Sequence, residues 1–157
     1  MKIDNVGLNF IKEVEGIRNN VYLDSAGLPT IGVGHLLTRD ELSSGKILIN
    51  GIAYRYKDGL SDHAIDQLLL KDLYIAQITV DRMVKVQLTQ NQFNALVSFC
   101  FNVGRGAFIN STLLKRLNAG KHEAVPFELR RWKYAGGRVI QGLINRREKE
   151  IKMWNCE

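Results

Sequence analysis

The sequence contains little that could bind a metal or build a disulfide framework. Its 157 residues include two cysteines, Cys100 and Cys156, and three scattered histidines. Two cysteines do not make the dense framework of a small secreted domain, and no Cys/His spacing matches a zinc site. Cys100 lies in the apolar run ALVSFCF, which predicts a buried thiol that acts as a small hydrophobic residue. We therefore expect no metal and no cofactor.

Long uncharged apolar segments are also missing. The N-terminal residues MKIDNVGLNFIKE carry charges at positions 2, 4 and 12, which does not fit the apolar core of a signal peptide. Residues 86–104 lack charge but contain several Gln and Asn side chains, so they predict a core helix rather than a membrane span. We expect a chain that is made in the cytoplasm without a signal peptide and does not insert stably into a membrane.

The charge of the sequence is distributed unevenly. Residues 105–157 contain 12 Lys and Arg against 5 Asp and Glu, whereas residues 1–104 contain 10 against 11. A basic surface favours a polyanionic partner, which leaves nucleic acid, an anionic membrane and an acidic cell-wall polymer open. No recognised nucleic-acid-binding motif accompanies the basic segment.

Apolar spacing predicts an α+β chain with its strands near the N-terminus. Short strands are expected within 21–35, around the turn DSAG, and a tight hairpin turn is expected at Asn50-Gly51. Helices are predicted at 3–15, after LTRDEL, at 62–82, in TQNQFNALVSFCFNVG, and at 111–119, 122–129 and 140–154. The long helix at 62–82 is the expected joint between two lobes, and a groove between lobes is a common ligand site.

Glu15 is a candidate general acid. It lies at the C-terminal end of the first helix, beside Ile11 and Leu8 on the edge of the apolar face, whereas Glu13 points to the polar side. Apolar neighbours and the negative end of the helix dipole both disfavour the ionised carboxylate. A carboxyl group that stays protonated suits general acid catalysis at neutral pH. The alternative is a helix-end glutamate bonded to Arg18.

Asp24 and Thr30 follow within 16 residues of Glu15. Asp24 begins the turn DSAG, where a purely local Asx turn is the alternative role. In the expected strand TIGVGH, alternation places Thr30 with Gly32 and Gly34 on one face. Strand glycines often mark close approach by a ligand, so we expect Thr30 to look onto a bare surface with room for a ribbon-like substrate.

Two carboxyl groups, a hydroxyl and a bare sheet surface indicate glycoside hydrolysis, in which one carboxyl protonates the leaving oxygen and the other stabilises charge or orders a water. The pattern E-G-(x7)-D-(x5)-T-I-G-x-G-H, which runs from Glu15 to His35, resembles the signature of the phage-type lysozymes, the endolysins of glycoside hydrolase family 24. The similarity continues through FNVGRGAFINSTLLKRLNAG, RRW and YAGGRVIQGLINRRE, covers nearly the whole chain, and is nearest to the lambdoid-phage branch.

The resemblance implies a two-lobe lysozyme fold, with a small N-terminal β lobe and a larger helical C-terminal lobe joined by a long helix. Residues 1–157 would form one lysozyme-like domain. Its parts would be an N-terminal lobe at 14–60, a connecting helix at 61–82, and a helical lobe at 83–157 packed with helix 3–15. The segment GKILINGIAYRYKDG matches the family poorly. We expect it to form the Asn50-Gly51 hairpin, lying beside the strands that carry Asp24 and Thr30.

The resemblance also implies a substrate and residue roles. The substrate would be bacterial peptidoglycan, cut at the β-1,4 bond between N-acetylmuramic acid and N-acetylglucosamine. By position, Glu15 matches the general acid, Asp24 the second carboxylate, and Thr30 the hydroxyl that helps to place a water. A structural pair of His35 with Asp72 is also expected. Substrate-facing or near-cleft positions are matched by Gly32, Phe101, Asn102, Phe108, Ser111 and Arg131.

As partners, the resemblance implies peptidoglycan glycan strands, no nucleic acid, and a holin that releases a monomeric enzyme from the host cytoplasm to the periplasm. Two alternatives compete with this enzyme. A cell-wall-binding module on an inactive lysozyme fold would require loss of a catalytic residue, yet Glu15, Asp24 and Thr30 are all present. A basic nucleic-acid-binding domain would explain the charge but lacks a motif.

Overall fold

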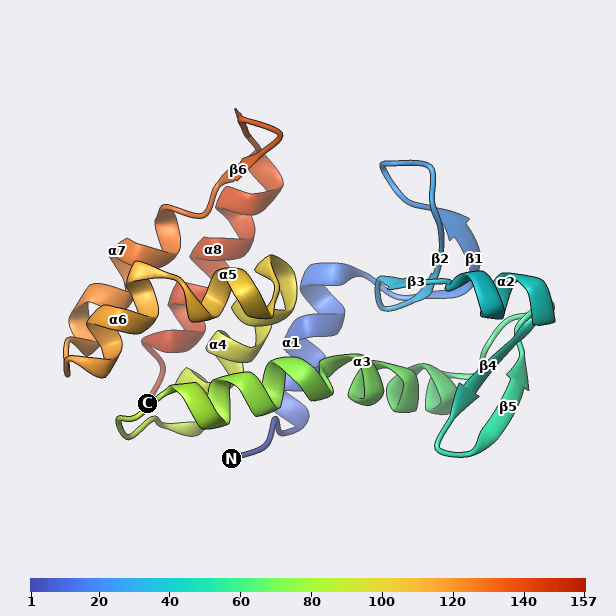
Figure 1. Ribbon diagram of the computed structural model, residues 1–157, viewed down its shortest axis with the longest axis horizontal. Helices are drawn as coiled ribbons and strands as arrows, with labels where there is room; N and C mark the ends of the chain where they lie inside the picture. The colour runs from blue at the N-terminus through green and yellow to red at the C-terminus, as the bar shows by residue number, and fades with distance from the viewer. The chain divides into compact units, whose positions relative to one another are not determined.

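The chain has an α+β fold in which most of its short strands lie between residues 18 and 55 and helices dominate the remainder (Figure 1). The computed structural model describes residues 1–157. In chain order the elements are α1 (Asn5–Glu15), β1 (Arg18–Leu23), β2 (Pro29–Gly32), β3 (His35–Leu36), α2 (Arg39–Ser44), β4 (Lys46–Ile49), β5 (Ile52–Arg55), α3 (Asp62–Met83), α4 (Gln90–Val103), α5 (Arg105–Ile109), α6 (Thr112–Asn118), a 3₁₀ turn (His122–Ala124), α7 (Val125–Arg130), β6 (Tyr134–Ala135), β7 (Arg138–Val139) and α8 (Gln141–Trp154).

The chain divides into two compact units. We call Met1–Leu8 with Ile75–Glu157 the helical unit, and Asn9–Tyr74, which holds β1 to β5, the mixed unit. The divisions fall within α1 and within α3, whereas the boundaries predicted from the sequence follow helix ends. The two lobes and connecting helix expected from the sequence stay a prediction. None of the helices is both long and apolar enough to cross a membrane.

Strands β1, β2 and β3 form an antiparallel sheet in that order, around the turn predicted at DSAG. Tyr22 of β1 pairs with Thr30 of β2, and Thr30 pairs in turn with Leu36 of β3. Thr30 therefore lies in the central strand. Its neighbour Ile31 is fully buried and anchors the sheet.

The segment TIGVGH is not the single strand that alternation predicted. Strand β2 ends at Gly32, a turn follows, and β3 begins at His35. Gly32 and Gly34 have φ angles of 67° and 68°, a left-handed conformation that residues with a side chain disfavour. The two glycines allow this turn. The prediction of a bare sheet surface beside Thr30 is wrong. A Cβ added at Gly32 would lie 3.7 Å from Ile65 of α3, and Thr30 is only 2% exposed.

Strands β4 and β5 form the hairpin predicted at Asn50-Gly51. Ile49 pairs with Ile52 across the turn. Asn50 and Gly51 have φ angles of 51° and 80°, the positive values that a type I′ turn requires. Ile47 and Ile49 are buried, while the alternate residues of β4 are exposed. The hairpin therefore has one apolar face turned inward, and its prediction is confirmed.

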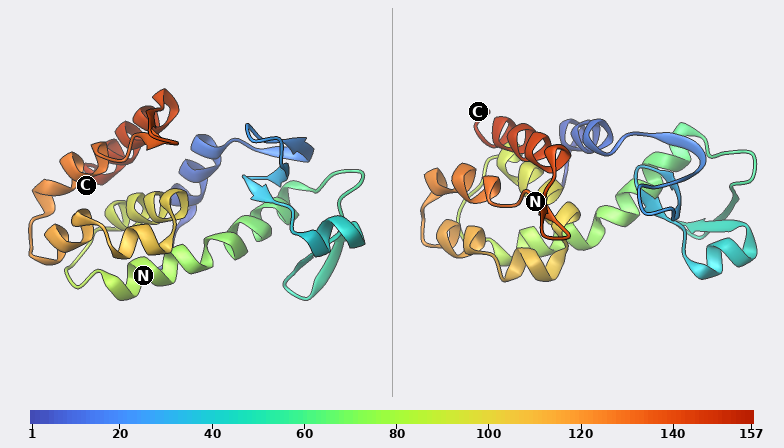
Figure 2. Two further views of the ribbon diagram at one scale, coloured as in Figure 1. Left: turned by 45° about the horizontal axis from the view of Figure 1, so that its top comes forward. Right: turned by 90° about the horizontal axis from the view of Figure 1, so that it is seen from above.

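The hairpin is held by α2 and α3, not by hydrogen bonds to the three-stranded sheet. A capping box between Thr38 and Glu41 begins α2. The Tyr56 hydroxyl donates a hydrogen bond of 2.8 Å to the Glu41 carbonyl, and Lys71 Nζ of α3 donates one of 2.6 Å to the Leu48 carbonyl. Figure 2 shows the hairpin standing next to α2.

Helix α4 is the centre of the helical unit. Its N-terminus has the predicted capping box of Thr89 with Gln92, and Gly104 ends it. Every residue from Phe93 to Cys100 is buried, since α4 packs against α8 and α5. Burial raises the pKa of the Cys100 thiol to about 12, so this cysteine is the inert core residue that its apolar surroundings predicted.

Two short elements of the helical unit were not predicted. Helix α5 has only five residues and no side-chain cap, so it gives almost no periodic signal. Strands β6 and β7 are two residues each and are joined at Gly136-Gly137, both with positive φ. The expected helices at 111–119, 122–129 and 140–154 correspond to α6, to the 3₁₀ turn with α7, and to α8.

Candidate active site

Glu15 is the last residue of α1. Asp4 precedes the helix and Gly16 follows it. The Asp4 carboxylate accepts the Gly7 N–H at 3.0 Å, and Gly16 leaves the helix with a φ of 79°. This fixes the half-buried Glu15 at the helix C-terminus, as predicted. The guanidinium of Arg18 lies 4.8 Å from the centre of the Tyr22 ring.

The Glu15 carboxylate lies against the turn between β2 and β3. A Cβ added at Gly34 would stand 3.2 Å from Glu15 Oε2. This separation is tighter than nine in ten real Cβ contacts, so a side chain at Gly34 would require the carboxylate to shift by a few tenths of an ångström. Glycine at position 34 therefore allows the backbone conformation and leaves room for the Glu15 carboxylate.

Asp24 does make the local turn that was its alternative role. Its Oδ1 accepts the N–H groups of Ala26 and Leu28, each at 2.9 Å. Both bonds end on Oδ1, and Oδ2 accepts none from the protein. The turn therefore fixes one oxygen of the half-buried carboxylate and leaves the other for a water or a ligand.

Thr30 is tied to Asp24 through one peptide group. The Thr30 hydroxyl and the Asp24 N–H both donate to the Leu28 carbonyl, each at 2.9 Å. Because a hydroxyl that donates still has acceptor lone pairs, Thr30 Oγ1 remains able to accept a hydrogen bond from a water. The mixed unit thus holds the two carboxyl groups and the hydroxyl singled out from the sequence. Carboxyl groups that exchange protons, with a hydroxyl that orients water, suit hydrolysis by general acid–base chemistry.

His35 is bonded on both ring nitrogens. Its Nδ1 lies 2.7 Å from Asp72 Oδ2 of α3, and its Nε2 lies 2.8 Å from Glu41 Oε1 of α2. Burial alone would lower the pKa of His35, but the two carboxylates outweigh it and raise the pKa above 6.5. The expected pair with Asp72 is confirmed, and Glu41 is an additional partner that was not predicted from the sequence.

Two of the predicted substrate positions are core positions instead. Phe108 is fully buried, with its ring centre 6.1 Å from the ring centre of Phe99 in an edge-to-face arrangement. Gly32 is buried beneath α3, as described above. Neither offers a surface to a sugar. The sequence could not predict this, because apolar spacing cannot separate a residue that lines a cleft from one that lies just behind it. Phe101 is partly exposed and Asn102 exposed.

Ser111 and Arg131 line a common hollow of about 290 Å³ in the helical unit, with Glu128 and Trp132. The Ser111 hydroxyl caps α6 by accepting the Leu114 N–H. Arg131 donates to Glu128 Oε2 at 3.1 Å, and Glu128 is only 3% exposed. A buried carboxylate therefore holds a guanidinium at the rim of the hollow. The sequence analysis did not single out Glu128, although its spacing of three residues from Arg131 on a helix was a signal.

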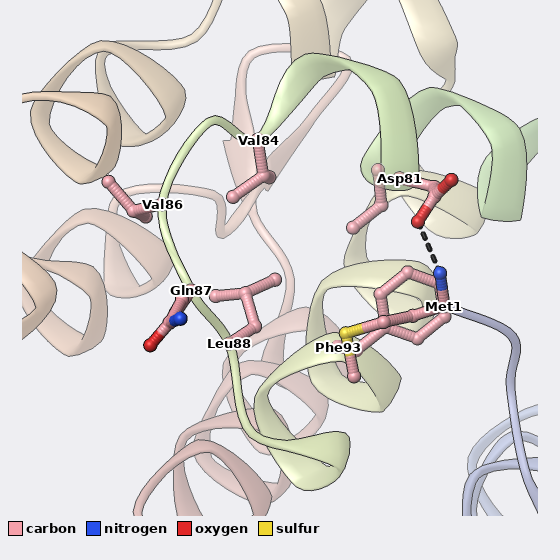
Figure 3. A pocket seen from close by; sticks show the side chains of 8 residues that line it. Met1, Asp81, Val84, Val86, Gln87, Leu88 and Phe93 are labelled. Carbon is pink, nitrogen blue, oxygen red and sulfur yellow. Dashed lines mark hydrogen bonds and ion pairs between the residues drawn. The ribbon is translucent and has the colours of Figure 1, made fainter.

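A second hollow, of about 380 Å³, contains none of the predicted site residues (Figure 3). Apolar side chains from the end of α3, the following loop and α4 line it, and the Met1 ammonium pairs with Asp81 at its rim. No group of three or more His, Cys, Asp or Glu side chains is arranged to hold a metal ion.

Comparison with known proteins identifies the family of the chain. The family model described as phage lysozyme matches residues 12–150. The endolysin of Salmonella phage P22 is 36% identical over 150 residues, which are 96% of this chain and 95% of that protein. The endolysin of Bacillus phage B103 is 38% identical over 96% of this chain but only 52% of its own length, so the chain spans about half of that relative.

Solved structures agree with this result. The endolysin from Escherichia coli O157:H7 phage FAHEc1 has a TM-score of 0.82 and 33% identity, over 99% of this chain and 94% of that one. The match covers both units and includes the segments on which the resemblance was recognised. The chain belongs to the phage lysozyme family.

Proposed function

We propose that the chain is an endolysin that hydrolyses the β-1,4 bond between N-acetylmuramic acid and N-acetylglucosamine in bacterial peptidoglycan. One observation carries the proposal: Glu15, Asp24 and Thr30 lie together in the mixed unit, with Asp24 and Thr30 joined to a single carbonyl. Membership of the phage lysozyme family supports the same substrate class.

In this proposal Glu15 donates a proton to the leaving glycosidic oxygen. Asp24 stabilises positive charge on the sugar and orients the attacking water together with Thr30 Oγ1. Thr30 Oγ1 shares the Leu28 carbonyl with the Asp24 N–H and can still accept a hydrogen bond from a water, which favours an Asp24 carboxylate that positions a water over one that attacks the sugar itself. This chemistry uses side chains and water alone.

The biological setting is also part of the proposal. A chain made in the host cytoplasm must reach peptidoglycan in the periplasm, so a holin is the partner that the family resemblance implies. The basic residues of 105–157 suit an anionic cell wall without a nucleic-acid partner.

The test is replacement of the proposed acid. Glu15→Gln keeps the shape of the side chain but removes its acidic proton, so cleavage of purified sacculi should fall by about 10²–10⁴-fold, the usual contribution of general acid catalysis. Circular dichroism should show an unchanged fold. Glu13→Gln is the matched control, since it removes the same charge from an exposed position of the same helix. Clearance by Glu15→Gln at the wild-type rate would contradict the assignment.

A further inference from the structure

The hairpin of β4 and β5 has two different faces. Its inner face holds Ile47 and Ile49, which are 0% and 1% exposed, so these side chains pack into the mixed unit. The outer face carries Lys46 and Leu48 of β4, which are both exposed. The turn of the hairpin lies at the end away from α2 (Figure 1). Because the inner face alone anchors the hairpin, the outer face is free for another use.

Two positive charges stand directly opposite each other on the outer face. Lys46 of β4 pairs with Arg55 of β5, and both side chains are exposed. Neither makes an ion pair with an acidic side chain of the protein. Like charges placed directly opposite in a sheet are destabilising. The pair is therefore an unfavourable arrangement that an anion from outside the protein would relieve.

The turn end of the same hairpin is apolar. Leu48 and Ile52 flank the turn and are 59% and 56% exposed. The Asn50 side chain donates a hydrogen bond of 3.0 Å to Gln67 Oε1 of α3, and Lys71 Nζ of α3 donates one of 2.6 Å to the Leu48 carbonyl. Two large aliphatic side chains are thus held in water at the end of a fixed hairpin.

The spacing of these groups matches an anionic lipid surface. Leu48 and Lys46 are two residues apart on one face, which separates them by about 7 Å along the strand. Apolar side chains that bind in the plane of a membrane enter about 5–10 Å into the boundary between headgroups and acyl chains. With Leu48 at that depth, Lys46 and Arg55 reach the level of the lipid phosphates. An acidic polymer in water would use the two charges but would leave both aliphatic side chains exposed.

We propose that the outer face and turn of the β4–β5 hairpin form a docking site for an anionic phospholipid surface. Leu48 and Ile52 enter the interface, and Lys46 and Arg55 bind the phosphate groups. The docking is peripheral. It uses none of the proposed catalytic residues, so this inference can fail while the proposed function stands.

Vesicle binding tests the proposal. Wild-type protein should sediment with vesicles of equal parts phosphatidylcholine and phosphatidylglycerol, and should stay free with phosphatidylcholine alone. Each Lys or Arg near an anionic membrane contributes about fivefold in affinity, so Lys46→Gln with Arg55→Gln should weaken binding by about 10- to 30-fold. The control is Lys115→Gln with Lys121→Gln, which removes the same charge from exposed residues of the basic segment 105–157 and should have little effect. No binding by wild-type protein, or an equal loss in both double variants, would overturn the proposal.

Further variants separate a lipid surface from an acidic polymer. Leu48→Thr with Ile52→Thr keeps residues that favour strands but removes apolar surface, so vesicle binding should fall by at least about tenfold. Val139→Thr, at a 52% exposed position of β7, should not change it. Unchanged vesicle binding by the first of these variants would contradict insertion of the turn. If Lys46→Gln with Arg55→Gln instead loses binding to lipid-free sacculi and keeps vesicle binding, the partner is a cell-wall polymer and the proposal is wrong.

Lys46→Glu gives a result that a purely structural role would not produce. It replaces the like-charged pair with an opposite-charged pair to Arg55, so the melting temperature should rise while vesicle binding falls. A lower melting temperature, or vesicle binding equal to that of wild-type protein, would contradict the proposed use of the pair.

Discussion

At the scale of single residues, Asp24 makes the local turn, and in the proposed function it is also the second carboxylate of the site. It supports a tight turn through Oδ1, and its other oxygen is available to a water. The two roles make different demands on the side chain, because the turn needs only an oxygen acceptor whereas charge stabilisation needs the carboxylate.

Asparagine at this position separates the roles. Asparagine also favours Asx turns, so Asp24→Asn should leave the melting temperature nearly unchanged. Cleavage of sacculi should nevertheless fall by about 10²–10⁴-fold, since the carboxylate that orients the water is lost. Turbidity assays and thermal melts of the variant measure both effects. Wild-type activity with an intact fold would reduce Asp24 to a turn residue.

His35 gives the fold a pH dependence with a defined sign. Its pKa is raised by Asp72 and Glu41 against the opposing effect of burial. The stabilisation is therefore fully present below the ordinary value of 6.5 and is lost as pH rises through the raised pKa. Burial opposes the charge of Glu41, but bonds from Thr38 and His35 lower its pKa. Its contribution is lost as pH falls through that lowered value.

The measurement is urea unfolding of wild-type protein and His35→Gln across a pH series, with an NMR titration of the histidine. We expect the difference in unfolding free energy to be largest when both His35 and Glu41 are charged, and to shrink as pH rises. A His35 pKa at or below its ordinary value would contradict this account.

At the scale of elements, the turn between β2 and β3 brings a glycine with positive φ against the proposed general acid. Gly34 has a φ of 68° and lies against Glu15, while Gly45, which ends α2, has a φ of 70° and no atom within 4 Å of an added Cβ. The two glycines therefore share the backbone demand but differ in their contact with the proposed acid.

Alanine at the two positions should give similar stability and different activity. Each of Gly34→Ala and Gly45→Ala should lower the free energy of unfolding by about 1–2 kcal/mol, the cost of a left-handed residue with a side chain. Only Gly34→Ala should also slow glycan cleavage, because its Cβ would stand 3.2 Å from Glu15 Oε2 and shift the carboxylate. Equal activity of the two variants in turbidity assays would show that the contact does not position Glu15.

Local sequence signals predicted elements well where a side chain acts on its own backbone. The capping box at Thr89, the stop at Gly104 and the Asn50-Gly51 turn all depend on neighbouring residues. The prediction of a single strand over TIGVGH was wrong, because the structure of this segment does not depend on neighbouring residues alone. Period-two alternation could not indicate that Gly32 and Gly34 turn the chain, or that Gly32 lies against Ile65 of α3.

At the scale of the whole molecule, the candidate site was predictable only in part. Glu15, Asp24 and Thr30 could be singled out because residue type and spacing specify their chemistry. The partners that fix other side chains could not be predicted, because these contacts do not follow the spacing of a regular helix or strand. Glu41 is six residues from His35 and meets it through the folding of α2, and Arg147 meets Asn102 across 45 residues. No periodic pattern in the sequence indicates such contacts.

The central claim is that this chain hydrolyses the glycan of peptidoglycan, and the products report on it most directly. Purified sacculi digested with the wild-type protein should release muropeptides whose mass spectra show a reducing-end N-acetylmuramic acid, because water adds across the β-1,4 bond. Sacculi treated with Glu15→Gln should release almost none. A 1,6-anhydro end would instead mean a lytic transglycosylase, and release of no muropeptides by the wild-type protein would contradict the account altogether.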